Sequence, residues 1–186
     1  MSPGIFLDRD GVINRERSDY VKSWHEFVFL PGALQALRKL ATLQWPIIII
    51  TNQSAIGREL MTDETVADIH HRMLAAISKA GGRIDGIFVC PHHPRDGCNC
   101  RKPLPGLLHH AARSHKIHLP TSYFVGDAVT DLLAAQAAGC RSILVQSGRQ
   151  GPELHTLTKN HKHMQLLPAL PDAVSLILNN IASIPA

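Results

Sequence analysis

Two aspartates near the N-terminus are the residues of this chain that most directly indicate chemistry. Asp8 and Asp10 lie one residue apart, directly after the apolar stretch Ile5–Leu7. Residues i and i+2 of a strand point to the same side, so we expect both carboxylates to converge where the strand opens into a loop. Converging carboxylates repel each other unless a cation, a shared proton or a phosphate-handling role accompanies them. Two solvated aspartates in a turn are the alternative at this point.

A second group of reactive residues lies in the middle of the chain. Three cysteines and a histidine fall within one short segment, at Cys90, His92, Cys98 and Cys100. Three thiols and an imidazole match a tetrahedral zinc site, and four protein ligands would make that site structural. A disulfide or buried free thiols are the alternatives, although a disulfide is disfavoured in the cytoplasm and leaves one thiol unpaired. The spacing alone does not choose between His92 and His93.

Apolar runs alternate with helical patterns along the whole chain. Runs rich in Ile and Val predict strands that are buried on both faces of a parallel sheet. We expect strands at Ile5–Leu7, Ile47–Ile50, Ile84–Cys90, Tyr123–Val125, Ser142–Val145 and, more weakly patterned, Met164–Leu167. The helical patterns predict helices at Gly32–Leu43, Thr62–Ala80, Pro105–Ser114, Thr130–Ala138 and Asp172–Ile181. This alternation predicts one α/β domain over residues 1–186, a doubly wound Rossmann-like sheet with helices on both faces and no large cap domain.

The composition narrows the class of protein. The chain has 186 residues, of which 45% are hydrophobic, which suits one globular domain. No stretch approaches the ~20 apolar residues of a membrane span, and no signal segment precedes the first strand, so we expect a cytoplasmic protein. A net charge of +4 without a Lys/Arg run, and 5% aromatic residues, favour a small anionic substrate over nucleic acid. We expect a monomer, and a mobile loop at Gly148–His163.

Polar clusters follow four consecutive strands of the expected sheet. They are Asp8–Gly11, Thr51–Ser54, Arg101–Pro103, and Gly126–Asp127 together with Asp131. Each cluster alone has a purely structural interpretation, such as a helix entry or an N-cap. Ligands of doubly wound sheets bind at the carboxyl ends of the strands, however, and all four clusters fall there. Their shared placement favours one common site.

The order of these motifs resembles the haloacid dehalogenase superfamily of phosphohydrolases. Four longer stretches, Phe-Leu-Asp-Arg-Asp-Gly-Val-Ile-Asn, Thr-Asn-Gln-Ser, Cys-Pro-His-His-Pro and Cys-Arg-Lys-Pro-Leu-Pro-Gly, are similar to the heptose bisphosphate phosphatase family within it. The resemblance covers most of residues 4–148. It implies magnesium-dependent removal of the 7-phosphate of D-glycero-D-manno-heptose 1,7-bisphosphate, a step toward lipopolysaccharide or S-layer heptose. A histidinol-phosphate phosphatase and a non-catalytic phosphosugar-binding module are the alternatives.

The residue types suit this chemistry. A carboxylate with a pKa near ~4 is ionised at neutral pH, so Asp8 can attack phosphorus without a base and form an aspartyl-phosphate. Asp10 would protonate the leaving alkoxide and later take a proton from water. Thr51 would offer its hydroxyl to the transferring phosphoryl group, and Lys102 its positive charge.

Magnesium prefers oxygen ligands, and three aspartates can supply them. We expect the carboxylates of Asp8 and Asp127 and the backbone carbonyl of Asp10 to bind the ion. Asp131 follows Asp127 by one helical turn and could hold a metal-bound water or orient Lys102, and an acid on the helix surface is the alternative.

Further site residues are implied by the resemblance. The family pattern assigns the zinc site to His92 together with the three cysteines. It implies substrate contacts from Arg9, Glu16, Ser18, Asp19, Tyr20, Asn52, Gln53, Ser54 and Arg101, of which Arg101 suits a second phosphate through its bidentate fork. Ala55 and Glu59 stand where family members often carry Gly, and Ala128 where several carry Lys or Ser. These departures leave the sugar and its anomer open.

Histidines outside the cysteine cluster lack partners at metal-binding spacing. Six of them lie on helices or at helix ends without Cys or carboxylate ligands at matching spacing, namely His70, His71, His109, His110, His115 and His118. We expect them to be solvated or to lie at the edge of the core.

Overall fold

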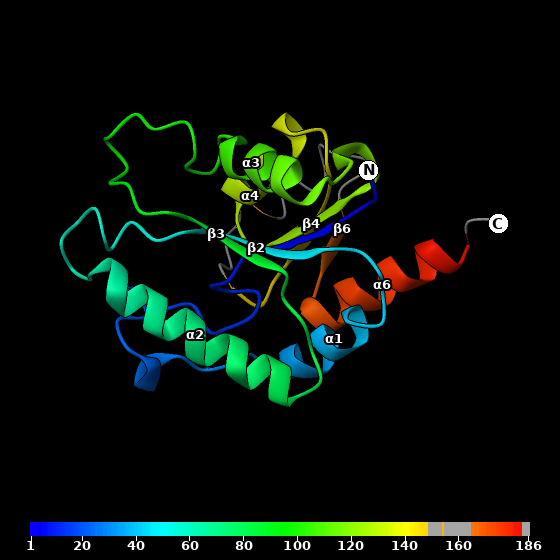
Figure 1. Cartoon of the computed structure of the whole chain (residues 1–186), viewed down its shortest axis with the longest axis horizontal. Coiled ribbons are helices and arrows are strands. Elements are labelled where there is room, and N and C mark those ends of the chain that lie inside the picture. Colours follow the sequence, from blue (N-terminus) through cyan, green and yellow to red (C-terminus); the bar gives the residue numbers. More distant parts are fainter. Residues whose placement is uncertain (149–153, 155–164, 184–186) are drawn as a thin grey trace.

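Six parallel strands form the sheet at the centre of the computed structural model, which describes residues 1–148, 154 and 165–183 (Figure 1). The strands are β1 (Ile5–Leu7), β2 (Ile47–Asn52), β3 (Gly86–Cys90), β4 (Tyr123–Gly126), β5 (Arg141–Val145) and β6 (Gln165–Leu167). Their order across the sheet is β3-β2-β1-β4-β5-β6. The predicted doubly wound parallel sheet is confirmed, because this order reverses on either side of β1 as in Rossmann folds.

The strand ends differ slightly from those expected. β2 runs on past Ile50, because Thr51 and Asn52 pair with Val89 and Cys90 of β3. Thr51 therefore belongs to the sheet, and its backbone is held as firmly as the apolar strand before it. β3 begins at Gly86 rather than at Ile84. Met164 lies outside the described residues.

Helices cover both faces of the sheet, as predicted (Figure 1). α3 (Gly106–His115) and α4 (Val129–Ala137) lie on one face. The other face carries α1 (Ala33–Leu40), α2 (Asp63–Lys79) and α6 (Leu170–Ala182). Two short 3-10 turns, at Trp24–Glu26 and Leu119–Thr121, complete the described helical elements.

The core lies in two layers, one on each face of the sheet. Alternate residues of a strand point to opposite faces, so Ile5 and Leu7 join the layer under α1, α2 and α6. Phe6 of the same strand packs into the layer under α3 and α4. Burial on both faces explains why the strands are apolar throughout rather than alternating.

β1 and β4 flank the point at which the strand order reverses. They pair in parallel with Leu7 opposite Val125, and the backbone N–H of Asp8 donates to the carbonyl of Val125 over 2.9 Å. A crevice forms at such a reversal because the connections from the two strands leave in opposite directions. The fold thus places the residues after β1 and β4, Asp8 and Asp127, at the expected ligand site.

None of the described helices combines the length and apolar character needed to cross a membrane. Most of the expected mobile loop at Gly148–His163 falls outside the described residues, apart from Gly148 and Leu154.

Candidate active site and metal centres

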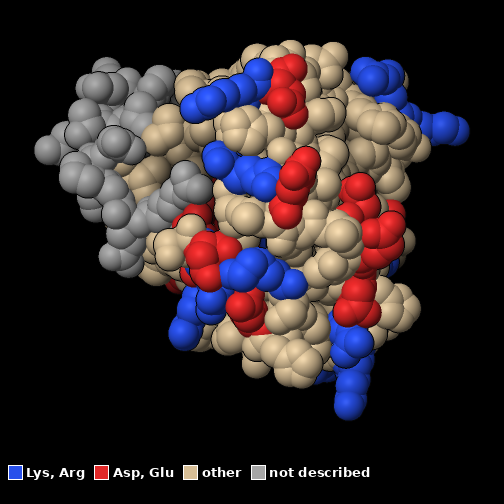
Figure 2. All heavy atoms as spheres, turned by 90° about the vertical axis from the view of Figure 1, so that its left-hand side faces the viewer, with Lys and Arg blue, Asp and Glu red and all other residues tan. Residues whose placement is uncertain are grey.

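A cavity of about 880 Å³ opens at the carboxyl ends of the strands. Its lining comes from the segments after β1, β2, β4 and β5 and from the loop after β3, and includes six basic and four acidic side chains. Figure 2 looks onto the face from which the loops after β2 and β3 project, and shows basic and acidic groups close together there. Because the basic side chains outnumber the acidic ones, the cavity suits an anionic ligand.

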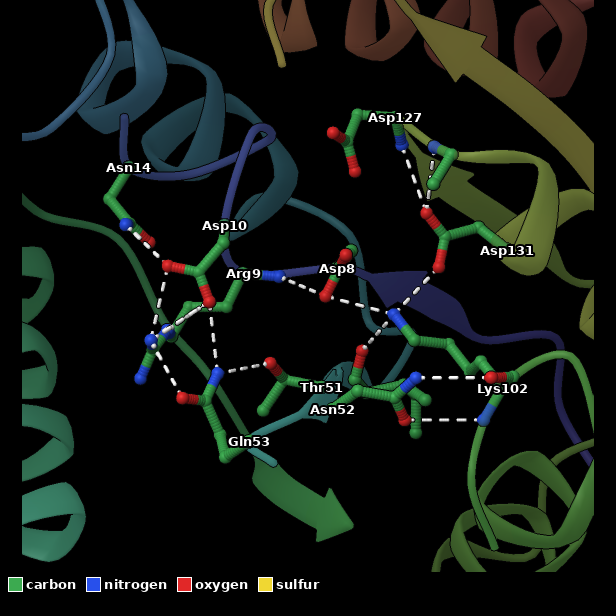
Figure 3. Close-up of polar contacts among 12 residues, drawn as sticks. Asp8, Arg9, Asp10, Asn14, Thr51, Asn52, Gln53, Lys102, Asp127 and Asp131 are labelled. Atoms are coloured by element: carbon green, nitrogen blue, oxygen red, sulfur yellow. Dashed lines mark hydrogen bonds and ion pairs between the residues drawn. The ribbon is translucent and has the colours of Figure 1, made fainter. Parts of the chain in front are cut away.

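Lys102 lies at the base of this cavity between two carboxylates (Figure 3). Its Nζ is 2.9 Å from Asp8 Oδ1 and 2.6 Å from Asp131 Oδ1, and the lysine side chain is only 2% exposed. Nζ also donates to the carbonyl oxygen of Ile50 over 3.0 Å. An ammonium group has three N–H donors, so these three partners fix its position. The two carboxylates raise the pKa of Lys102 above its usual value despite burial, and it stays charged.

The loop that carries Lys102 is tied to the end of β2. The side-chain amide of Asn52 donates to the carbonyl of Lys102 over 3.1 Å and accepts from its N–H over 3.2 Å. Asn52 lines the cavity as well, but both ends of its amide are used in this pairing. The resemblance implied a substrate contact for Asn52, whereas the geometry gives it a part in positioning Lys102.

Asp131 is an interior residue and not a helix-surface acid. It is 2% exposed, and its Oδ2 accepts from the backbone N–H groups of Asp127 and Ala128 over 3.1 and 3.0 Å. N–H groups at the start of a helix have no acceptor within the helix backbone, and the carboxylate of Asp131 supplies one for α4. Its other oxygen faces Lys102. Of the alternatives considered from the sequence, orientation of Lys102 fits these contacts.

Three carboxylates gather where magnesium was expected. One oxygen from each of Asp8, Asp127 and Asp131 lies within 4.8 Å of the others. Gly11 and Gly148 close in on Asp127, and a Cβ atom at either glycine would overlap its carboxylate. Gly11 also has a φ of 81°, which glycine adopts without strain. So many oxygens in one buried place suit a hard divalent cation, and the donor set fits magnesium.

The second acid of the pair, Asp10, has partners of its own. β1 ends at Leu7, so strand alternation is not what places the two carboxylates. Figure 3 shows Asp10 turned toward Arg9, Asn14 and Gln53, while Asp8 faces Lys102. Asp10 accepts from Asn14 Nδ2 over 2.8 Å and from Gln53 Nε2 over 2.9 Å, in addition to the guanidinium of Arg9. Both acids nevertheless line the cavity.

The two acids titrate in opposite directions. Burial raises the pKa of Asp8 to about 7, with Lys102 opposing the shift and the charges of Asp131 and Asp10 adding to it. Burial also disfavours ionised Asp10, but the charge of Arg9 and the hydrogen bonds from Asn14 and Gln53 outweigh it and lower the pKa of Asp10. A cation beside Asp8 would favour its ionised form.

Thr51 and Gln53 connect the end of β2 to Asp10. Thr51 is 1% exposed, and its Oγ1 accepts from Gln53 Nε2 over 2.8 Å. The same amide nitrogen donates to Asp10, and Gln53 Oε1 accepts from Arg9 Nη2 over 3.1 Å. Gln53 therefore orders three site residues with one side chain, while also lining the cavity.

Most of the residues implied as substrate contacts line the cavity. Those that line it are Arg9, Glu16, Ser18, Tyr20, Asn52, Gln53, Ser54 and Arg101. Tyr20 has a φ of 67°, and its hydroxyl lies 3.4 Å from Ser54 Oγ. A positive φ at a bulky residue is uncommon and is often found at ligand sites.

Asp19 does not join the cavity lining. Its carboxylate pairs with Lys22 Nζ at 2.5 Å and with Arg17 Nη2 at 3.0 Å, and the side chain is 57% exposed. These local basic partners draw it outward, so the structure separates Asp19 from the remaining predicted contacts.

Several cavity residues were missed by the sequence analysis. Arg15, Arg17 and Arg58 add positive charge to the lining, and Asn14 orients Asp10. Arg15 and Arg58 lie among loop residues without a motif of their own, so only the fold brings them to the site. Their closeness in the sequence to Asp8–Gly11 and Thr51–Ser54 was the available sign that these three arginines line the site.

The cysteine and histidine cluster forms beside this site. Ligand atoms of Cys90, His92, Cys98 and Cys100 all lie within 4.8 Å of one another. His92 Nδ1 is 3.2 Å from Cys100 Sγ, and Cys90 Sγ is 3.3 Å from Cys100 Sγ. All three cysteines are free thiols, so the disulfide alternative does not apply.

His93 points elsewhere, because its Nδ1 accepts from the N–H of Arg95 over 3.1 Å. The cluster thus contains His92, as the family pattern assigns. The separations of 3.2 to 3.7 Å between ligand atoms lie slightly below the ~3.8 Å between sulfur atoms of a tetrahedral zinc site with Zn–S of about 2.3 Å, so the four groups are close enough to bind one ion. Burial raises the pKa of Cys90 to about 12, so a cation is needed to hold its thiolate.

Known proteins are similar to this chain in sequence and in fold. A family model described as HAD-hydrolase-like matches residues 99–173. D-glycero-beta-D-manno-heptose-1,7-bisphosphate 7-phosphatase of Bordetella bronchiseptica is 46% identical over 144 residues, which cover 77% of this chain and 80% of that protein. The alpha-anomer phosphatase of Mycobacterium bovis is 42% identical over 154 residues, which cover 79% and 81%.

A solved structure agrees with the sequence relatives. The D,D-heptose 1,7-bisphosphate phosphatase of B. bronchiseptica, complexed with magnesium and phosphate, superposes with a TM-score of 0.87 at 39% identity. The match covers 96% of this chain and 99% of that one. The fold and the sequence are thus those of a HAD-like phosphatase, an enzyme that hydrolyses phosphate esters. Within that class, the chain belongs to the D-glycero-D-manno-heptose-1,7-bisphosphate 7-phosphatase family.

Proposed function

We propose that the protein is a magnesium-dependent phosphatase that removes the 7-phosphate of D-glycero-D-manno-heptose 1,7-bisphosphate. The observation that carries the proposal is Lys102 buried between Asp8 and Asp131, in a cavity whose basic side chains outnumber its acidic ones. The names of the similar phosphatases from B. bronchiseptica and M. bovis support the substrate. Because these relatives differ in anomer, both anomers are candidates.

Asp8 is the nucleophile in this proposal. Its carboxylate oxygen forms a bond to the 7-phosphorus as the bond from phosphorus to the sugar oxygen breaks. Asp10 is ionised at neutral pH because its pKa is lowered, so it first binds a proton and then gives it to the departing oxygen. The heptose 1-phosphate leaves with a neutral hydroxyl group at C7. Water then attacks the phosphorus of the aspartyl-phosphate, and Asp10 takes a proton from the water. The bond between the phosphorus and the Asp8 oxygen breaks, which releases inorganic phosphate and restores the Asp8 carboxylate.

The residues around the phosphoryl group stabilise the charge that moves during transfer. Thr51 offers its hydroxyl, and Lys102 its fixed ammonium group, to the phosphoryl oxygens. Asp8, Asp127 and the backbone carbonyl of Asp10 would hold magnesium, with Asp131 in its outer shell. When bound, the cation neutralises phosphate charge and acts as a Lewis acid. Arg101 Nη1 is buried without a hydrogen-bond partner among the described residues, which supports a role in binding substrate anions.

The remaining assignments belong to the same proposal. Zinc would be held by Cys90, His92, Cys98 and Cys100 and would stabilise the loop that carries Arg101 and Lys102. The enzyme acts as a single domain and a monomer in the cytoplasm. The small phosphorylated sugar is its sole partner.

The test is phosphate release by the purified enzyme from a panel of phosphate esters, with magnesium and after chelation. Both heptose bisphosphate anomers, histidinol phosphate and p-nitrophenyl phosphate form the panel. We expect kcat/KM to be highest for one heptose anomer and to vanish without magnesium. Preference for histidinol phosphate would make the protein a phosphatase of that related type, and binding without turnover would make it a phosphosugar-binding module.

Asp8→Asn provides the matched control for the mechanism. The amide is nearly isosteric but cannot attack phosphorus, so substrate should still bind while phosphate release stops. Wild-type enzyme quenched in acid should carry a phosphoryl adduct sensitive to hydroxylamine, and Asp8→Asn should not. Release by Asp8→Asn at the wild-type rate would exclude Asp8 as the nucleophile.

A further inference from the structure

The buried guanidinium group of Arg9 holds the carboxylate of Asp10. Arg9 is 0% exposed, and its Nε and Nη2 atoms donate to Asp10 Oδ2 over 3.1 and 2.8 Å. Nη2 also lies 3.1 Å from Asp10 Oδ1. A fork of this kind fixes the plane of a carboxylate as well as its distance. The orientation of Asp10 therefore depends on where Arg9 is held.

A histidine contacts the far end of the same guanidinium. Arg9 Nη1 lies 3.0 Å from His70 Nε2, and His70 is 8% exposed on α2. A guanidinium group has only donors, so His70 Nε2 accepts, and a neutral ring then carries its proton on Nδ1. Burial and the charge of Arg9 lower the pKa of His70 to about 4, which agrees with a neutral ring.

His70 is remote from the reacting atoms. It does not line the cavity, and 61 residues separate it from Arg9 along the chain. It can therefore affect the reaction only through the side chain it contacts. From the sequence, His70 is expected to be solvated or to lie at the edge of the core. It is 8% exposed, and its contact with Arg9 was not predicted.

We propose that His70 is a positioning residue that holds Arg9 so that Asp10 faces the reacting oxygen throughout the catalytic cycle. The inference rests on the proposed function, because it takes Asp10 as the group that moves the proton. His70 Nε2 accepts from Nη1 of the guanidinium, and Gln53 Oε1 accepts from Nη2. These two contacts hold Arg9 from groups other than Asp10, so the guanidinium can orient the carboxylate of Asp10.

This role predicts a dependence on the leaving group. An alkoxide departing from a sugar is strongly basic and needs the proton from Asp10, whereas nitrophenolate is weakly basic and leaves without one. Misplacing Asp10 should therefore slow phosphoryl transfer from the sugar and spare the transfer from p-nitrophenyl phosphate. A histidine that merely supported the fold would affect both reactions equally.

The experiment uses rapid-mixing kinetics on the magnesium-loaded enzyme. His70→Leu removes the acceptor, and His70→Gln offers an amide oxygen in its place. For His70→Leu we expect the single-turnover rate on heptose bisphosphate to fall about 10- to 100-fold, while the burst of nitrophenol stays within about threefold of wild type. His70→Gln should recover most of the loss. His71→Leu, an exposed neighbour on α2, is the matched control and should change neither rate.

Two results would overturn the inference. One is an equal fall for both substrates, and the other is an unchanged rate of His70→Leu on heptose bisphosphate. If His70→Leu does not fold, nitrogen NMR of the wild-type imidazole decides, because a proton on Nε2 rules out the contact with Arg9 and a bare Nε2 supports it. Asp10→Asn separates the two proposals: unchanged turnover of heptose bisphosphate contradicts the proposed function itself, whereas slow turnover with wild-type rates for His70→Leu contradicts only the role of His70.

Discussion

The ammonium group of Lys102 lies 2.6 Å from the carboxylate of Asp131, and both side chains are 2% exposed. Burying one charge alone is costly, so each group accounts for the presence of the other. Asp131 is in turn fixed by two backbone N–H groups at the start of α4. Through Asp131, helix α4 therefore sets the position of the Lys102 ammonium group, which also contacts Asp8.

Asp131→Asn tests that relationship. The amide oxygen can still accept both backbone hydrogen bonds, but the neutral side chain no longer offsets the charge of Lys102. We expect kcat/KM for phosphate release to fall about 10- to 100-fold, since a shift of about 1 Å at a reacting group has effects of this size. Asp172→Asn is the matched control, because Asp172 caps α6 through the N–H of Ala169 in the same way but is remote from the site. Activity of Asp131→Asn within twofold of wild type would contradict the positioning role.

The fold could be predicted because its strands are buried on both faces. Continuous apolar runs such as Ile47–Ile50 are typical of strands that are buried on both faces. The alternation of these strands with helices then indicates a parallel sheet. The motif residues could be placed for the same reason, since carboxyl ends of parallel strands share one edge. Lys102 and Asp131 lie together at that edge, although the sequence left a helix-surface position open for Asp131.

Contacts that depend on tertiary packing could not be predicted. Nothing in the sequence pairs Arg9 with His70, because 61 residues separate them and the pairing arises only when α2 packs beside the loop after β1. The position of Asp19 was decided locally, by Lys22 and Arg17. The orientation of Asp10 was missed because β1 ends three residues before it.

Glu59 adopts a backbone conformation that favours glycine. Its φ is 58°, and it is exposed in the turn after β2, outside the cavity lining. Glu59→Gly should raise the free energy of unfolding by about 0.5 to 1 kcal/mol, because relief of the left-handed strain exceeds the entropic cost of glycine. Urea denaturation measures the change. Ala75→Gly, at an exposed position within α2, should instead lower stability by about 1 kcal/mol, and a loss for both variants would contradict the strain.

His70 should make folding sensitive to acid. Burial and the charge of Arg9 lower its pKa from 6.5 to about 4, so between these values the unfolded chain binds a proton that the folded protein does not. Stability therefore falls as the pH drops through this window, by about 2 kcal/mol from His70 between pH 7 and pH 5. Urea denaturation at both pH values should show a smaller loss for His70→Gln than for wild type. An equal loss in the two proteins would show that His70 does not titrate in this way.

Two cysteines of the cluster closely precede Lys102 in the sequence. Cys98 and Cys100 directly precede Arg101 and Lys102, so a metal held by the cluster would fix the backbone that presents both basic groups. Most of the core of the sheet is formed by the strands and the helices on its two faces, and Cys98 and Cys100 pack only against the edge of one layer. Loss of the metal should therefore affect the site more than the fold.

Cys100→Ser separates these two effects. We expect a folded protein with near-native circular dichroism, a lower zinc content by elemental analysis, and a fall in kcat/KM of about 100-fold, because a loosened loop misplaces Lys102. Cys140→Ser is the matched control: Cys140 is buried outside the cluster, where its thiol donates to the carbonyl of Ser122 over 3.2 Å, so its zinc content and activity should match wild type. Wild-type protein purified without chelator should contain one zinc ion per chain. Absence of stoichiometric zinc, or full activity of Cys100→Ser, would show that the cluster does not hold a structural metal that positions Lys102.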